Sequence, residues 1–243
     1  MRARADRLTP VATHDRLLRP AVLAAGSLLL LSTLLIALWV PSDRAEGYRQ
    51  RIFYLHVPIA LTAYLFLLVG AFYAARYLMR RDPLDDLRSY VAIHQGVILG
   101  TLVLISGPIW AKVSWGIWWD WSDKQLNTFL LVFLFYCAYF MLRYSVDEGA
   151  RRERFSAIYA LLGIGMVPLS LAAVHLAGTL HHPTVFHRDG PAMERSMFIA
   201  FLVSWASFVL LAAVLWRLEL RGKLLAQGVQ RLEKRLRGEA VLP

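Results

Sequence analysis

Apolar residues gather in six long runs along the chain, and short polar segments separate these runs. The runs cover residues 21–40, 56–75, 90–111, 125–142, 155–174 and 196–216, and none of them contains Asp, Glu, Lys or Arg. A bilayer core of about 30 Å is crossed by about 20 helical residues, which is close to the length of each run. The pattern predicts an all-α, polytopic integral membrane protein built as a bundle of six transmembrane helices.

The basic residues are distributed unevenly between the connections. With the N-terminus placed in the cytoplasm, 20 of the 27 Lys and Arg residues fall on the cytoplasmic side. Since short cytoplasmic loops retain Lys and Arg, this count predicts that both termini are cytoplasmic. The outer connections are then residues 41–55, 112–124 and 175–195. We expect a single membrane domain over 1–243, with a cytoplasmic basic tail at 217–243 that contacts anionic lipid.

Composition narrows the class of protein further. The chain is 58% hydrophobic with a net charge of +10, which effectively excludes a soluble enzyme, and topology explains the charge better than nucleic acid does. The single cysteine, Cys137, supplies neither a disulfide framework nor a haem-attachment motif. Because the runs hold no charged residue and the chain has no phosphate-binding loop, we expect neither ion-coupled transport nor ATP hydrolysis. No catalytic residues are evident, so an enzyme is not expected.

Tryptophan is concentrated in one predicted outer connection, at about residues 110–125. Five of the eight tryptophans lie within twelve residues, and Gly116 permits a tight turn among them. They are Trp110, Trp115, Trp118, Trp119 and Trp121. An interfacial aromatic belt is one interpretation, but belt residues usually flank helices. Crowding in one connection favours a flat apolar ligand packed against the indole faces.

Histidines gather on the same predicted side. His56 precedes Pro58 at the start of the second run, so we expect it at the mouth of that helix. The third outer connection adds His175, His181, His182 and His187. Imidazoles beside an apolar wall suit the axial ligation of haem, while the four histidines of the third connection make zinc an alternative.

Haem propionates need cationic partners, and four basic residues are available on this side. These are Arg49, Arg51, Lys112 and Lys124. Ordinary snorkelling to the membrane interface is the alternative, and we favour it for Arg49 and Lys112.

The motif from Trp115 to Trp121 is followed by Lys124-Gln-Leu and by an apolar run that ends at Arg143. This arrangement resembles the tryptophan-rich signature of the cytochrome c assembly family. Within that family, the chain resembles the haem exporter protein C branch most closely. The features that carry this resemblance are the chain length, the six runs, the segment from Arg51 to Pro58 and the segment Thr179-Leu-His181. The resemblance covers most of the chain.

This resemblance implies that haem b is bound transiently at the outer, periplasmic face of a bacterial inner membrane and is presented to a haem chaperone. By the resemblance, His56 and His181 are the axial ligands, with His175 or His182 as alternatives to His181. It also implies a haem platform formed by Trp115, Trp118, Trp119 and Trp121. The implied propionate partners are Arg51 and Lys124. The implied partners are ATP-binding-cassette subunits, a small single-span membrane subunit, the chaperone and the lipid bilayer, with no nucleic acid.

Two rival functions remain open at this point. One is a scaffold or permease subunit of an export complex, which binds no haem. The other is an electron-transfer subunit with b-type haem, which needs paired histidines inside facing helices. Only His94 lies well inside a run, which disfavours the second rival.

Overall fold

A computed structural model describes residues 16–43, 46–177, 186–187, 190–191 and 193–237 of the chain. Its principal helices are α2 (Leu18–Leu38), α3 (Phe53–Arg80), α4 (Pro83–Trp115), α5 (Lys124–Ser145), α6 (Ala150–Leu162), α7 (Met166–Ala177) and α8 (Arg195–Leu236). Short elements are the 3-10 helices η3 (Tyr48–Ile52) and η4 (Gly163–Gly165) and an antiparallel pair of strands, β1 (Phe186–His187) and β2 (Gly190–Pro191). Within the described residues, six helical segments are long and apolar enough to cross a membrane. The predicted six-helix membrane fold is confirmed.

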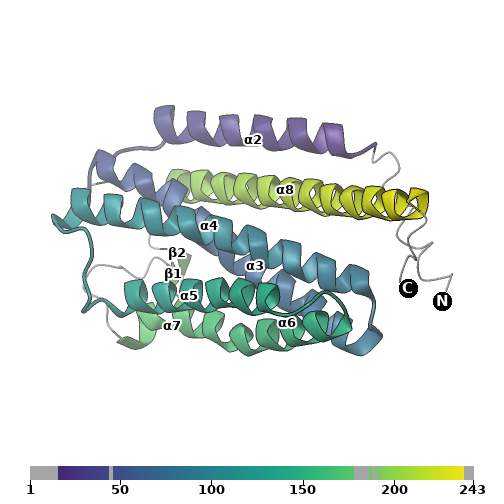
Figure 1. Ribbon diagram of the computed structural model, residues 1–243. Coiled ribbons are helices and arrows are strands. Elements are labelled where there is room, and N and C mark those ends of the chain that lie inside the picture. Colours follow the sequence, from purple (N-terminus) through teal and green to yellow (C-terminus); the bar gives the residue numbers. More distant parts are fainter. Residues whose placement is uncertain (1–15, 44–45, 178–185, 188–189, 192, 238–243) are drawn as a thin grey trace.

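The helices form layers around the antiparallel pair α3 and α4 (Figure 1). Helix α8 lies on one side of this pair, and α2 packs on the outer side of α8. Helices α5, α6 and α7 cover the opposite side. We call the end of the bundle that carries the connection between α4 and α5 the tryptophan end. The end that carries the turn between α3 and α4 is the basic end.

Local sequence signals explain where the central helices begin and end. The carboxylate of Asp82 accepts a hydrogen bond from the backbone N–H of Leu84 and caps α4, and Asp123 caps α5 in the same way. Helix α4 ends at Gly116, whose φ of 80° lies in the left-handed region that glycine adopts without strain. Since α4 continues to Trp115, the connection between α4 and α5 is shorter than the predicted stretch of residues 110–125.

The fifth predicted span is a broken helix. Helices α6 and α7 are joined by η4, which starts at Gly163. A Cβ atom at Gly163 would stand 2.7 Å from the Tyr136 hydroxyl oxygen, so only glycine allows α5 to approach this closely. The break therefore lies where the chain packs tightly against its neighbour.

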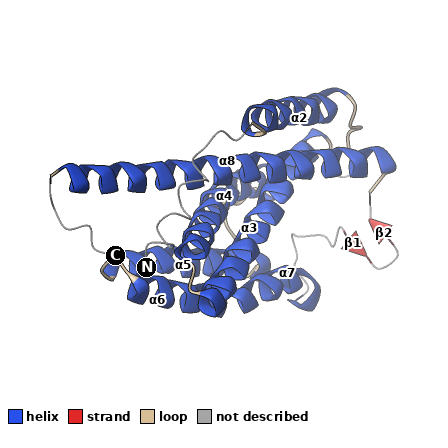
Figure 2. Ribbon diagram, turned by 90° about the vertical axis from the view of Figure 1, so that its right-hand side faces the viewer, coloured by secondary structure: helices blue, strands red, loops and turns tan. Residues whose placement is uncertain are grey.

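Helix α8 is much longer than the predicted span 196–216. It continues without interruption to Leu236 and so includes most of the predicted tail 217–243. Figure 2 shows that its far part projects beyond the helices that it covers. Leu220 and Leu224 are still buried against the bundle, which explains why the helix does not end with the apolar run.

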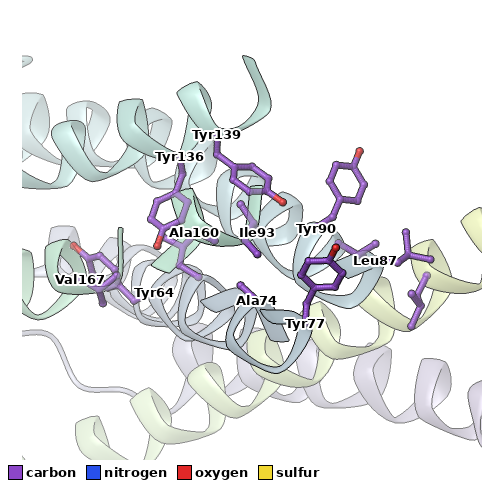
Figure 3. Close-up of a cluster of buried hydrophobic side chains, with 14 of the residues drawn as sticks. Tyr64, Ala74, Tyr77, Leu87, Tyr90, Ile93, Tyr136, Tyr139, Ala160 and Val167 are labelled. Carbon is purple, nitrogen blue, oxygen red and sulfur yellow. The ribbon is translucent and has the colours of Figure 1, made fainter. Parts of the chain in front are cut away.

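The core between α3, α4, α5 and α6 is rich in tyrosine (Figure 3). Tyr77, Tyr136 and Tyr139 are each only 1% exposed, and they pack with Ile93 and Ala160. The Tyr64 hydroxyl, at the other side of this cluster, lies 2.8 Å from the hydroxyl of Ser170 on α7. Aromatic packing of this kind holds the central helices in fixed register and thereby positions the tryptophan end.

Candidate haem-binding site

His56 lies in the first turn of α3 at the tryptophan end, where the sequence placed it. The 3-10 helix η3 runs directly into α3, so the chain enters the helix without a flexible hinge. The His56 ring is partly buried, and its Nδ1 atom lies 2.8 Å from the hydroxyl oxygen of Ser106 on α4. His56, one of the two predicted iron ligands, is therefore held between the central helices α3 and α4.

The face of α4 opposite His56 is shaped to receive an imidazole. A Cβ atom at Gly107 would stand 3.1 Å from the Cε1 atom of His56, so the ring lies directly over the backbone of α4. One turn further on, the Trp110 ring meets His56 edge to face, with ring centroids 5.6 Å apart. The Trp115 ring lies 6.3 Å beyond Trp110 and extends the aromatic surface along the helix.

The remaining tryptophans lie in the connection that follows α4. Trp118 is 59% exposed and Trp121 is 74% exposed, whereas Trp119 is partly buried. The rings of Trp119 and Trp121 are 5.7 Å apart. Large exposed indoles in one short segment form an apolar surface that a ligand or partner can cover.

Hydrogen bonds hold this connection in a fixed shape. The Asp120 carboxylate accepts hydrogen bonds from the backbone N–H and the hydroxyl of Ser122, at 2.8 and 2.6 Å. The Asn127 amide donates to the carbonyl of Trp121 at 2.6 Å. Together with the cap at Asp123, these bonds fix the backbone that carries Trp118, Trp119 and Trp121.

The four basic residues of this end differ in their contacts. Lys112 donates to the carbonyl of Gly116 at 2.8 Å, and Arg49 donates to the carbonyl of Val113 at 3.1 Å. Both therefore stabilise the end of α4. The snorkelling to the membrane interface that the sequence favours for these two residues stays a prediction. The Arg51 guanidinium stacks 4.8 Å over the Tyr48 ring, and Lys124 is exposed in the first turn of α5.

Polar atoms without hydrogen-bond partners are concentrated at the tryptophan end. Among the described residues, twelve buried side-chain nitrogen and oxygen atoms lack a partner, and eight belong to residues 46–54 and 110–127. They include the Nε atom of Arg51, the hydroxyl of Tyr54 and the indole nitrogens of Trp110 and Trp119. Five of the eight atoms can donate, and the other three are acceptor oxygens of Glu46, Gln125 and Asn127. Since buried polar groups are normally satisfied, the five donors suit a ligand with carboxylate groups.

The predicted second ligand, His181, and its alternative His182 lie outside the described residues. His175 lies in the last turn of α7 and His187 belongs to β1, but the positions of their side chains are not described. In the part of the chain that is described, no group of three or more His, Cys, Asp or Glu side chains is placed to hold a metal ion. His94 pairs with Glu219 through a 2.8 Å contact of its Nδ1 atom at a separate position on α4.

Sequence reasoning missed Ser106 and Gly107, and it left Trp110 out of the platform. The only signal for them was a Ser-Gly-Pro triplet inside an otherwise apolar run, one helical turn before a tryptophan. That signal does not reveal that His56 lies opposite.

The fold and the site together define a polytopic α-helical membrane protein with an imidazole and an aromatic surface at one end of its bundle. A model of the "Heme exporter protein C" family matches residues 3–235, so the chain belongs to this family. The resemblance noted in the sequence is confirmed.

Similar proteins come from bacteria and from plants. The chain is 30% identical to the heme exporter protein C of Bradyrhizobium diazoefficiens over 215 residues, which cover 88% of this chain and 81% of that protein. It is 29% identical to a putative cytochrome c biosynthesis ccmC-like mitochondrial protein of Marchantia polymorpha, over 81% of this chain and 83% of the relative. The heme exporter protein C of Escherichia coli K12 is 27% identical, over 77% and 75% of the two chains.

Proposed function

We propose that this protein binds haem at its tryptophan end and presents it to a haem chaperone during cytochrome c maturation. The observation that carries the proposal is the position of His56, which is held against α4 beside Trp110 and close to the tryptophan-rich connection. Family membership supports haem as the cargo. The protein acts by coordination and transfer, so it is a delivery protein and not an enzyme.

Each residue of the site has a distinct part in this proposal. The imidazole of His56 supplies one axial nitrogen, and His181 supplies the other, with His175 and His182 as alternatives. The indoles of Trp115, Trp118, Trp119 and Trp121 cover the macrocycle and exclude water from it.

Arg51 and Lys124 meet the propionates as charge-assisted hydrogen-bond donors. The unpartnered Nε atom of Arg51 supports its part in this pairing. The indole nitrogens of Trp110 and Trp119 are further donors within the same end of the bundle.

We further propose that the tryptophan end faces the periplasm of a bacterial inner membrane and that the basic end faces the cytoplasm. The excess of Lys and Arg in the connections of the basic end supports this orientation. Haem b is held transiently, and a partner displaces one imidazole when haem leaves. The proposed partners are the chaperone, ATP-binding-cassette subunits, which provide energy that this chain cannot, and a small single-span membrane subunit.

An absorbance spectrum of the detergent-purified protein, oxidised and reduced, tests the proposal. We expect a low-spin haem spectrum in the wild type that is lost or strongly weakened in His56→Ala and in His181→Ala. His94→Ala is the matched control, because the His94 imidazole on α4 pairs with Glu219 on α8, and His94 lies twelve residues before the Ser106 that contacts His56. A wild-type protein that contains no haem when its partners are co-expressed would leave the scaffold or permease function instead.

A further inference from the structure

Ser106 has no part in the function proposed so far, yet its hydroxyl lies within hydrogen-bond distance of His56. Its hydroxyl oxygen lies 2.8 Å from the Nδ1 atom of His56 and 2.8 Å from the carbonyl oxygen of Leu102. A longer contact of 3.4 Å reaches the carbonyl of Val103. The serine thus stands between the imidazole and the backbone of its own helix.

Counting protons fixes the direction of these two hydrogen bonds. A carbonyl oxygen only accepts, so the bond to Leu102 uses the single proton of the Ser106 hydroxyl. The same hydroxyl then has no proton left for the imidazole, and it accepts from His56 through its lone pair. Both bonds exist together only when the Nδ1 atom of His56 carries the proton. In the neutral imidazole, Nε2 then bears the lone pair that a metal requires.

We propose that Ser106 is the positioning residue of the haem ligand: it fixes His56 in the Nδ1–H tautomer and thereby directs Nε2 as the iron ligand. This inference rests on the proposed haem-binding function and names a residue that acts through His56. Three residues of one face of α4 restrain the ring, because Ser106 binds Nδ1, Gly107 lies beneath Cε1 and Trp110 contacts the ring edge to face.

The contact also changes the electronic character of the ligand. An imidazole that donates its second N–H to an oxygen is a more basic metal ligand, and such outer partners typically contribute about 10- to 100-fold to metal affinity. Because the Ser106 hydroxyl is held by Leu102, it cannot rotate away from the imidazole without losing a second bond. Removal of the hydroxyl therefore loosens the ring and weakens its bond to iron at the same time.

Three variants on α4 test the proposal spectroscopically. Ser106→Ala is expected to lower haem occupancy by about tenfold and to raise the reduction potential of the remaining haem, because a less basic imidazole stabilises the oxidised iron less. Ser106→Thr keeps the hydroxyl and is expected to restore both properties. Thr101→Val is the matched control, since the Thr101 hydroxyl bonds only to the carbonyl of Val97 on its own helix.

Chemical rescue separates the hydrogen bond from general effects on the fold. In His56→Gly, added imidazole is expected to restore the haem spectrum at lower concentration than 1-methylimidazole, which has no N–H for Ser106 to accept. The quantity to compare is the half-saturating concentration of 1-methylimidazole divided by that of imidazole. In His56→Gly/Ser106→Ala this ratio is expected to be several-fold lower than in His56→Gly. An equal ratio in both proteins would contradict the proposal.

The outcomes also distinguish this inference from the function on which it rests. A wild type without haem defeats the proposed function. A second outcome is that the wild type contains haem and His56→Ala loses it, while Ser106→Ala has the same haem occupancy and reduction potential as the wild type. That outcome defeats the role of Ser106 alone. Nitrogen-15 NMR of histidine-labelled, haem-free protein reads the tautomer directly, and an Nε2–H imidazole at position 56 would overturn the inference.

Discussion

Gly107 determines how closely the His56 imidazole approaches α4. Glycine in the middle of a helix costs about 0.5–1 kcal/mol relative to alanine. At this position the cost is offset by room for the ring, since a Cβ atom would press on Cε1 at 3.1 Å. Stability and ligand geometry therefore make opposite demands on this residue.

For Gly107→Ala we expect lower haem occupancy together with an unchanged or higher thermal stability. The added methyl group favours the helix but displaces the imidazole by a few tenths of an ångström. Haem content per protein and the unfolding temperature in detergent measure the two effects separately. Gly26→Ala on α2, where nothing lies within 4 Å of the added atom, is expected to leave haem content unchanged. Equal haem content in both variants would show that the close approach has no consequence for the ligand.

Trp118 allows the platform to be tested without disturbing the fold, because its ring is 59% exposed. We expect Trp118→Ala to weaken haem binding by about 2- to 10-fold, the range that corresponds to about 0.5–1.5 kcal/mol of aromatic contact. The unfolding temperature of the haem-free protein should hardly change. Trp39→Ala removes an indole that is 47% exposed at the end of α2, and it serves as the control. A similar small loss in both variants would favour an aromatic belt over a haem platform.

At the residue scale, the sequence predicts the side chains that carry chemistry better than those that position them. His56 and the tryptophan cluster are recognisable because their types are uncommon and their spacing is unusual. Ser106 and Gly107 matter only because α3 and α4 bring them opposite His56, fifty residues away in sequence. Contacts of that kind depend on helix packing, which a hydropathy pattern does not contain.

At the scale of elements, Pro58 creates a gap in α3 that α8 fills. Proline has no N–H, so the carbonyl of Tyr54 lacks its usual helical donor. The hydroxyl of Ser204 on α8 donates to that carbonyl instead, in a fully buried position. A proline near His56 therefore leads to a buried hydrogen bond between α3 and α8.

Ser204→Ala is expected to reduce the free energy of unfolding by about 1 kcal/mol, with some added cost for leaving a carbonyl unpaired away from water. Thermal unfolding in detergent measures this loss. Thr33→Ala is the control, since the exposed Thr33 hydroxyl bonds only within α2 and should have little effect. A loss no larger than that of Thr33→Ala would mean that Tyr54 and Ser204 do not share a stabilising bond.

The sequence predicts where helices cross the membrane but not how long they continue. Runs such as 125–142 agree with α5 to within a few residues. The break at Gly163 and the extension of α8 to Leu236 were not predicted, because hydropathy reports the preference for lipid and not the continuity of backbone hydrogen bonds. Close packing on Tyr136 explains the first feature, and buried leucines beyond the apolar run explain the second.

At the scale of the whole molecule, one buried ion pair ties α5 to the central helix α4 at the basic end. Arg143 on α5 binds both carboxylate oxygens of Asp86 on α4, at 2.9 and 2.7 Å. Both side chains are less than 10% exposed, and the Arg143 guanidinium also lies 4.6 Å over the Tyr90 ring. The arrangement leaves neither charge free to meet water.

Arg143→Met is expected to lower stability by about 3–5 kcal/mol, because it leaves the Asp86 carboxylate buried without a partner. Asp86→Asn/Arg143→Met should recover part of this loss, since no uncompensated charge remains. Expression level and thermal unfolding measure the effect. Glu148→Ala breaks an exposed pair with Arg152 and should change stability by less than about 1 kcal/mol. If Arg143→Met and Glu148→Ala lowered the unfolding temperature equally, the buried pair would contribute no more to stability than the surface pair.

The six-helix architecture could be predicted from the sequence because lipid imposes length and apolarity on every span. The order in which the helices pack could not be predicted, since all six runs are similar in composition. The structure shows that the first span contacts the last, while the third and fourth are clamped by a pair of charges that lie outside the apolar runs.

The packing of α2 on α8 has a consequence for how the protein is made. Of the described helices, α2 is synthesised first, whereas α8 begins at residue 195. At about 5–20 residues per second, the ribosome needs about 8–30 s to reach the partner of α2. During that time α2 lies in the bilayer without its principal contact. The packing of α2 on α8 forms only after α8 has been synthesised. A nascent chain that stops before α8 therefore leaves α2 without the helix that it packs on, even when its central helices have assembled.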